Sequence, residues 1–147
     1  MPQPKRPAHH GKDRSGQEPL SAADQGGQSD EHTTVAELRE VLRRFVEERQ
    51  WRTYHTPKNL VMALAIEAAE LMEHFQWLTP EEALAVPRDK QRLAAVGEEL
   101  ADVIGYALAL ANELGIDVAT TMRAKMAKNE LKYPAEQYRG KYEKPVW

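Results

Sequence analysis

Apolar residues recur every three or four positions through most of the chain between residues 34 and 134. This spacing places them on one face of an α-helix, whereas a half-buried strand would alternate apolar and polar residues. Four such stretches are long enough for main helices, and we expect them over about 34–51, 57–77, 88–114 and 117–133. No strand-like alternation of useful length is present, so the pattern predicts an all-α protein.

Several residues at the ends of these stretches are typical of helix caps. Thr34 and Glu37 have the spacing of a capping box, and Thr56 precedes a proline suited to a first helical turn. Thr79 starts a short helix in the same way, ahead of the third main helix. Gly115 follows that helix as a C-terminal cap. The helix boundaries therefore rest on local chemistry as well as on periodicity.

The elements predict one domain over 33–134, an antiparallel bundle of four main helices. Residues 1–32 contain no aromatic residue and half of the glycines, so we expect a disordered tail. Residues 135–147 are expected to form an irregular C-terminal tail. Gly97 and Gly105 lie inside the third helix, where each costs about 1 kcal/mol relative to alanine. We expect close helix packing to compensate at both positions.

Composition narrows the class of protein. The 147 residues carry a formal net charge of −3, which argues against a partner that is a nucleic acid polymer. The absence of cysteine excludes disulfides and thiolate metal sites and fits a cytoplasmic protein. No apolar run approaches the roughly 20 residues that span a bilayer, and no secretory signal is apparent. We therefore expect no membrane association.

Acidic residues are grouped on two of the predicted helices. Glu67 and Glu70 are three residues apart on the second helix, and Glu99 and Asp102 repeat that step on the third. Three-residue spacing places each pair on one side of its helix. No lysine or arginine lies within a helical turn of either pair, so the acids repel one another without local compensation. Two facing pairs of this kind would suit Mg²⁺, which prefers oxygen ligands.

Two readings of these acids stay open from the residues alone. A single pair three residues apart is common, and solvated acids on an outer face would explain it. Two such pairs on separate helices, both free of cations, are explained about equally well by a metal site. A di-iron bundle would require Glu-x-x-His pairs, and His74 does not stand at that spacing from an acid.

At these positions the chain resembles the MazG-like, all-α nucleoside triphosphate pyrophosphohydrolase family, and especially its dCTP pyrophosphatase branch. The matching stretches are FVEERQWRTYHTPKNLVMALAIEAAELMEHFQWL (45–78), EELADVIGYALALANELGID (98–117) and KMAKNELKYP (125–134). They cover nearly all of the predicted domain in order, and their combination is highly specific.

The resemblance implies a set of functional residues. The implied Mg²⁺ ligands, which are also the catalytic residues, are Glu67, Glu70, Glu99 and Asp102. The implied substrate-binding residues are Trp51, His55, Asn59, Trp77, Tyr106, Lys125 and Asn129. The aromatic members would stack on a nucleobase, and the polar ones would line the nucleotide site or hold phosphate oxygens. The family also implies a homo-oligomer, a dimer or tetramer, with active sites at subunit interfaces.

The expected reaction is Mg²⁺-dependent cleavage of a deoxynucleoside triphosphate, dCTP or a related pyrimidine nucleotide, to the monophosphate and pyrophosphate, which would control nucleotide pools. Two alternatives stay open. One is a relative that hydrolyses another triphosphate. The other is a non-enzymatic helical bundle that binds a partner protein and uses its acids only for solubility.

Overall fold

A computed structural model describes residues 29–141 of the chain. Two compact units are distinguished, 1–33 and 34–147. Within the described part of the first unit, the amides of His32 and Thr33 both donate to the carbonyl of Ser29, which forms a turn. Residues 1–28 lie outside the described part of the chain, and with them most of the predicted disordered tail.

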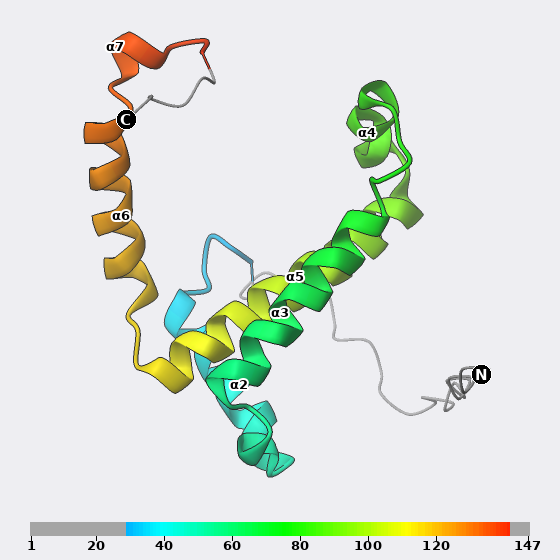
Figure 1. The fold of residues 1–147 in the computed structure, drawn as a ribbon. Coiled ribbons are helices and arrows are strands. Elements are labelled where there is room, and N and C mark those ends of the chain that lie inside the picture. The colour runs from blue at the N-terminus through cyan, green and yellow to red at the C-terminus, as the bar shows by residue number, and fades with distance from the viewer. Residues whose placement is uncertain (1–28, 142–147) are drawn as a thin grey trace, which may run out of the picture. The chain divides into compact units, whose positions relative to one another are not determined.

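The second unit is built from helices, as the sequence predicts (Figure 1). The α-helices are α2 (Val35–Glu48), α3 (Pro57–Glu73), α4 (Pro80–Ala85), α5 (Lys90–Leu114), α6 (Val118–Lys132) and α7 (Ala135–Tyr138). Two 3-10 helices, Trp51–Thr53 and Val86–Arg88, precede α3 and α5. No strand occurs in the described residues, so the all-α class is confirmed.

The predicted caps form as expected. The Thr34 hydroxyl accepts from the amide of Glu37, and the Glu37 carboxylate accepts from the amide of Thr34 at 2.6 Å. Thr79 makes the same reciprocal pair with Glu82 at the start of α4. Gly115 ends α5 at φ 62°, a left-handed conformation that favours glycine. These local hydrogen bonds satisfy amides that a helix leaves unpaired at its first turn.

Some boundaries differ from prediction. α2 ends at Glu48 rather than near Trp51 because Gln50 takes the left-handed conformation, with φ 52°. α3 ends at Glu73, and the chain continues through turns to Trp77. α7 forms a single helical turn inside the segment that was expected to be irregular.

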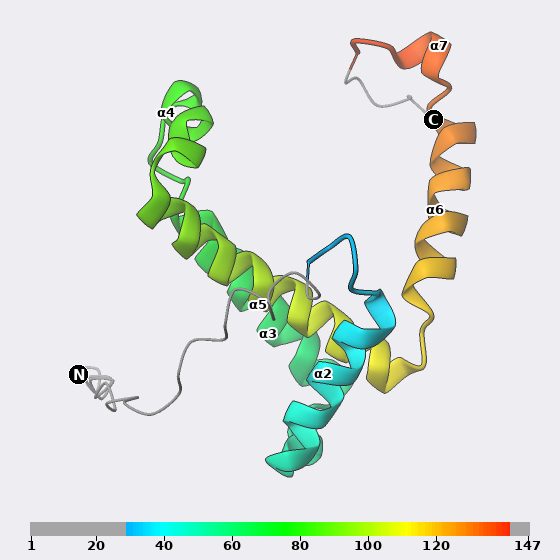
Figure 2. The same cartoon turned by 180° about the vertical axis from the view of Figure 1, so that it is seen from behind.

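Helices α3 and α5 lie against each other in opposite directions, joined at one end through α4, and α2 packs on α5 (Figures 1 and 2). Helix α6 makes no extensive contact with another described helix. The packed layer therefore consists of α2, α3 and α5, three of the four main helices. The predicted arrangement of four helices in one bundle is not seen in the described residues.

The core of this layer is small. Within the described residues the buried apolar side chains are Leu60, Val86, Leu108, Ala109 and Ala111. Leu60 is the most completely covered, with 2% of its surface exposed. Many apolar residues that recur at helical spacing are exposed instead, among them Val41, Phe45, Val61, Met72, Leu100, Ile104, Met122, Met126 and Leu131. One pair of facing helices covers only one side of each helix, so regular apolar spacing does not ensure burial within the single chain.

The two glycines inside α5 do not mark close helix packing within the chain. A Cβ built on Gly97 would meet nothing within 4 Å, and one built on Gly105 would meet only Leu42 Cδ2, at 3.8 Å. The expectation of close packing is therefore wrong at Gly97, and at Gly105 the contact is an ordinary one. Among the described helices, none is long and apolar enough to cross a membrane.

Candidate active site

The acids predicted as metal ligands come together where α3 faces α5. Glu67, Glu70 and Glu99 each offer a carboxylate oxygen, and these three oxygens lie within 4.8 Å of one another. Glu67 and Glu99 are partly buried, and Glu70 is exposed. The fourth acid, Asp102, is not part of this group but lies close enough for its charge to act on Glu67. The antiparallel pairing of the two helices thus brings the ExxE and ExxD pairs together.

The electrostatics of the cluster are unfavourable for the protein alone. Burial raises the pKa of Glu67 above its ordinary value, and the charges of Glu70, Asp102 and Glu99 raise it further. The ion pairs among the described residues all lie on α2 and the residue after it, and none includes an acid of the cluster. The cluster therefore carries negative charge that no described cation neutralises. Such an oxygen-rich, uncompensated set fits a hard divalent cation.

An aromatic slot lies beside the cluster, between α2 and α5. Its volume is about 140 Å³, and it is lined by Leu42, Phe45, Val46, Trp51, His55, Asp102, Gly105, Tyr106 and Ala109. Phe45 and Trp51 meet edge to face with their ring centroids 5.9 Å apart. Because Asp102 lines this slot, the slot adjoins the acid pair of α5.

Tyr106 links the slot to the acids. It stands one helical turn after Asp102 and is partly buried. Burial raises the pKa of its hydroxyl, and the charges of Glu67 and Asp102 raise it further. Tyr106 therefore stays protonated at neutral pH and presents a hydrogen-bond donor next to the carboxylates.

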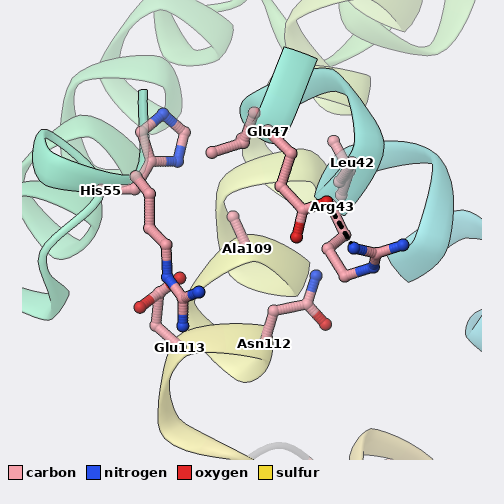
Figure 3. A pocket seen from close by; sticks show the side chains of 9 residues that line it. Leu42, Arg43, Glu47, His55, Ala109, Asn112 and Glu113 are labelled. Atoms are coloured by element: carbon pink, nitrogen blue, oxygen red, sulfur yellow. Dashed lines mark hydrogen bonds and ion pairs between the residues drawn. The ribbon is translucent and has the colours of Figure 1, made fainter. Parts of the chain in front are cut away.

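A second cavity of about 150 Å³ adjoins the slot (Figure 3). It is lined by Leu42, Arg43, Val46, Glu47, Arg52, His55, Ala109, Asn112 and Glu113. Four of these residues, Leu42, Val46, His55 and Ala109, also line the aromatic slot. The slot is mainly apolar, and this neighbouring cavity is rich in charged and polar side chains. We call it the polar cavity.

Several predicted substrate-binding residues are not brought to the slot within one chain. Trp77 is 86% exposed. It follows the C-terminal end of α3, whereas Trp51 precedes the N-terminal end. Since α3 has 17 residues, its two ends are about 25 Å apart. Lys125 and Asn129 lie on α6 and line neither cavity. Their roles stay predictions.

Asn59 also lies outside both cavities. Its side-chain amide donates to the carbonyl of Tyr54 at 3.0 Å, which fixes the loop that leads from Trp51 into α3. This contact gives Asn59 a structural role in presenting the aromatic residue. His55, in contrast, lines both cavities from the same loop.

Phe45 is a site residue that the sequence did not single out. Its position fits the helical spacing of apolar residues in the first predicted helix, yet it lines the slot and stacks with the Arg49 guanidinium 3.7 Å from its ring centroid. Apolar spacing does not distinguish a core side chain from one that lines a cavity. The nearby tryptophan six residues later was the only available signal.

The chain is similar to several known proteins. A family model of the MazG-like family matches residues 62–144. A protein of Rattus norvegicus named dCTP pyrophosphatase 1 is 37% identical over 125 residues, covering 85% of this chain and 73% of the relative. The Homo sapiens protein of the same name is 38% identical over 102 residues, covering 69% of this chain and 60% of the relative.

A solved structure is similar as well. A pyrophosphatase from Archaeoglobus fulgidus shares 42% identity and aligns with a TM-score of 0.64, covering 70% of this chain and 94% of the other. The bovine dCTP pyrophosphatase 1 is aligned over 63% of its own length, so the chain spans less than two thirds of some of the relatives it matches. On the family match and these identities, the chain belongs to the MazG-like family, on the branch that holds the relatives named dCTP pyrophosphatase 1.

Proposed function

We propose that the protein is a Mg²⁺-dependent nucleoside triphosphate pyrophosphohydrolase that acts on a deoxynucleoside triphosphate. The observation that carries this proposal is the position of the three-carboxylate cluster directly beside an aromatic slot on α5. A triphosphate needs cations at one end and a stacking surface at the other. The names of the similar proteins give the same reaction class.

The cluster fits Mg²⁺ by the chemistry of its donors. Carboxylates are the ligands that this cation uses in sites for phosphate substrates, where it keeps several waters. We assign Glu67, Glu70 and Glu99 as the residues that hold it, with Asp102 as the fourth ligand at the edge of the slot. When bound, Mg²⁺ would neutralise phosphate charge and lower the pKa of an attacking water.

The proposed reaction is attack of water on the phosphorus next to the sugar. The water oxygen bonds to that phosphorus, the bond to the β-phosphate oxygen breaks, and pyrophosphate leaves with the monophosphate as the second product. Trp51 would hold the base by stacking, which is worth about 1–3 kcal/mol per base, and Phe45, which meets Trp51 edge to face, would close one side of the slot. Tyr106 would donate a hydrogen bond near the sugar or the first phosphate, because it stands between the slot and the acids.

We further propose that the substrate is dCTP or a related pyrimidine nucleotide and that the reaction controls nucleotide pools. The similar proteins named dCTP pyrophosphatase 1 support cytosine as the base, and the small volume of the slot supports a base with a single ring. A cytoplasmic location stays a prediction.

Self-association is part of the proposal. Large apolar side chains are exposed on α2, α3 and α5, and extensive exposed apolar surface is typical of a protein interface. Trp77, Lys125 and Asn129 do not reach the slot in their own chain, so a second copy is the natural source of these groups. We expect a dimer or tetramer whose sites each use residues of two chains.

The first experiment measures pyrophosphate release from the eight common nucleoside triphosphates with Mg²⁺ and with a chelator. We expect turnover of a pyrimidine deoxynucleotide with Mg²⁺ alone, lost in Glu70→Ala and kept in Glu98→Gln, which changes an adjacent acid outside the cluster. A different preferred triphosphate would favour the first alternative function. No turnover, together with no effect of Mg²⁺ and nucleotide on the melting temperature, would favour a non-enzymatic bundle.

A second experiment tests shared sites. Glu70→Ala and Trp77→Ala are each expected to be inactive, and mixed oligomers of the two should regain part of the activity, because some hybrid sites combine an intact acid cluster with an intact tryptophan. Oligomers of either variant alone are the control. Absence of recovery in mixtures shown to contain both chains would contradict a site shared between chains.

A further inference from the structure

Some of the charged and polar side chains that line the polar cavity are already paired with other described residues. Arg43 is held by ion pairs to Glu40 at 2.6 Å and to Glu47 at 2.5 Å. Asn112 is held by Arg39, whose Nε donates to its Oδ1 at 2.7 Å. The remaining ionic groups of this cavity are those of Arg52 and Glu113.

Neither of these two side chains has a hydrogen bond or ion pair with another residue in the described range 29–141. Arg52 sits on the 3-10 helix Trp51–Thr53, directly after the tryptophan of the slot. Glu113 comes from α5, and Figure 3 shows its side chain beside that of Asn112 at the edge of the cavity. The guanidinium of Arg52, a hydrogen-bond donor, and the carboxylate of Glu113, an acceptor, therefore line the polar cavity without a partner among the described residues.

The polar cavity lies where the edge of a stacked base would reach. Asp102, Gly105, Tyr106 and Ala109 follow one face of α5 at steps of three or four residues, and Asn112 and Glu113 continue it. The rise from Asp102 to Ala109 is about 10 Å, which leaves room for a sugar and a ring beyond the phosphate. The two cavities share Ala109 and His55, so a base in the slot would direct its far edge into the polar cavity.

We propose that Arg52 and Glu113 determine base specificity by hydrogen-bonding to the pairing edge of a cytosine held in the aromatic slot. This inference rests on the proposed pyrophosphohydrolase function. Cytosine presents two adjacent acceptors, the O2 and N3 atoms, and then the N4 amino donor. The planar guanidinium of Arg52 can donate to both acceptors at once, and the Glu113 carboxylate can accept from N4.

The same two side chains disfavour uracil and thymine. These bases have a protonated N3 and a carbonyl oxygen at position 4, so the guanidinium faces a donor and the carboxylate faces an acceptor. Specificity of this kind arises because the wrong base would leave the guanidinium of Arg52 and the carboxylate of Glu113 unpaired in the complex; both side chains are exposed in the free chain, so the bound base is what covers them. Stacking in the slot does not provide it, since every base has a π face.

The test compares dCTP with dUTP, which share sugar, phosphates and ring size and differ only along the edge in question. We expect the wild type to have at least a tenfold higher kcat/KM for dCTP. Glu113→Gln should lower the dCTP to dUTP ratio about tenfold, because an amide can donate to the O4 of uracil. Arg52→Gln should lower kcat/KM for dCTP by about tenfold as well.

Matched controls are Glu81→Gln on α4 and Arg92→Gln on α5, both exposed and outside the two cavities. They should leave the ratio within twofold of the wild type. Turnover by all variants with an unchanged ratio in Glu113→Gln and Arg52→Gln, or a wild type that prefers dUTP, would overturn this inference alone. Absence of pyrophosphate release from any triphosphate by the wild type would instead overturn the proposed function, and this assignment with it.

Discussion

Replacing Glu70 by glutamine should have opposite effects on stability with and without metal. Glu70, Glu67 and Glu99 offer oxygens within 4.8 Å of one another, and no described cation pairs with them. In the presence of a chelator, the substitution removes the repulsion of Glu70 with Glu67 and with Glu99, and only the repulsion between Glu67 and Glu99 is left in this cluster. With Mg²⁺ and a nucleotide it removes a ligand. The first change stabilises the protein and the second destabilises it.

The magnitude follows from Coulomb's law. Two unit charges separated by about 4 to 5 Å in a water-like dielectric repel by about 1 kcal/mol, and Glu70 is exposed enough for that value to apply. Loss of two pairs should therefore stabilise the chelated protein by about 1 to 2 kcal/mol at low salt. For a chain of this size that corresponds to a rise in melting temperature of about 3 to 6 °C. Added salt should reduce the rise.

The assay is thermal unfolding at fixed protein concentration, because association makes the melting temperature depend on concentration. Wild type, Glu70→Gln and Glu98→Gln are compared in chelator and in Mg²⁺ with a non-hydrolysable nucleotide. Glu98 lies next to Glu99 on α5 but outside the cluster, so its variant should respond to metal as the wild type does. A Glu70→Gln protein that gains nothing in chelator and loses nothing with metal would refute the metal-site reasoning.

Three further predictions concern stability. Asn112→Ala removes the reciprocal hydrogen bonds with Arg39, at 2.7 and 3.1 Å, that join α2 to α5, and should cost about 2 kcal/mol in denaturant unfolding; a cost below about 0.5 kcal/mol would contradict this role. Because the folded-state pKa of Glu67 is raised, stability in chelator should be greatest below its ordinary value of 4.5 and fall as pH rises through the raised value. In Glu67→Gln the melting temperature should fall less as pH rises, because the titrating carboxyl is absent. A melting temperature that depends on pH as in the wild type would contradict this prediction. Gly97→Ala should stabilise the protein by about 1 kcal/mol, since a Cβ there meets nothing within 4 Å; destabilisation would place a second chain against that position.

Local structure could be predicted closely from the sequence because its causes are local. The hydroxyl of Thr34 and the carboxylate of Glu37 lie three residues apart and cap one helix end, so no distant contact is needed. The end of α2 was harder to predict. Gln50 takes a left-handed conformation that its residue type does not announce, and the helix stops before it.

The candidate site could be predicted in part. The acid pairs could be recognised in the sequence because paired acids with no lysine or arginine within a helical turn repel one another without compensation. The structure brings Glu67, Glu70 and Glu99 together. The polar cavity could not have been found in this way. Arg52 and Glu113 are 61 positions apart and become neighbours only through the packing of the loop before α3 against α5, which no spacing rule describes.

The exposed apolar residues explain both why regular apolar spacing does not ensure burial within the single chain and the form of the proposed site. Regular apolar spacing predicts that a side chain is buried. It does not indicate whether the residues that bury it belong to the same chain or to a second copy. Leu100 and Ile104 stand on α5 with nearly half of their surfaces exposed, although their spacing matches that of the buried Leu108. Trp77, which follows the end of α3 that is distant from the slot, is also exposed. A second copy that covers this surface would explain both why apolar residues are exposed in the single chain and why some substrate-binding residues do not reach the slot. A variant that keeps the chain monomeric should therefore lose stability and activity together.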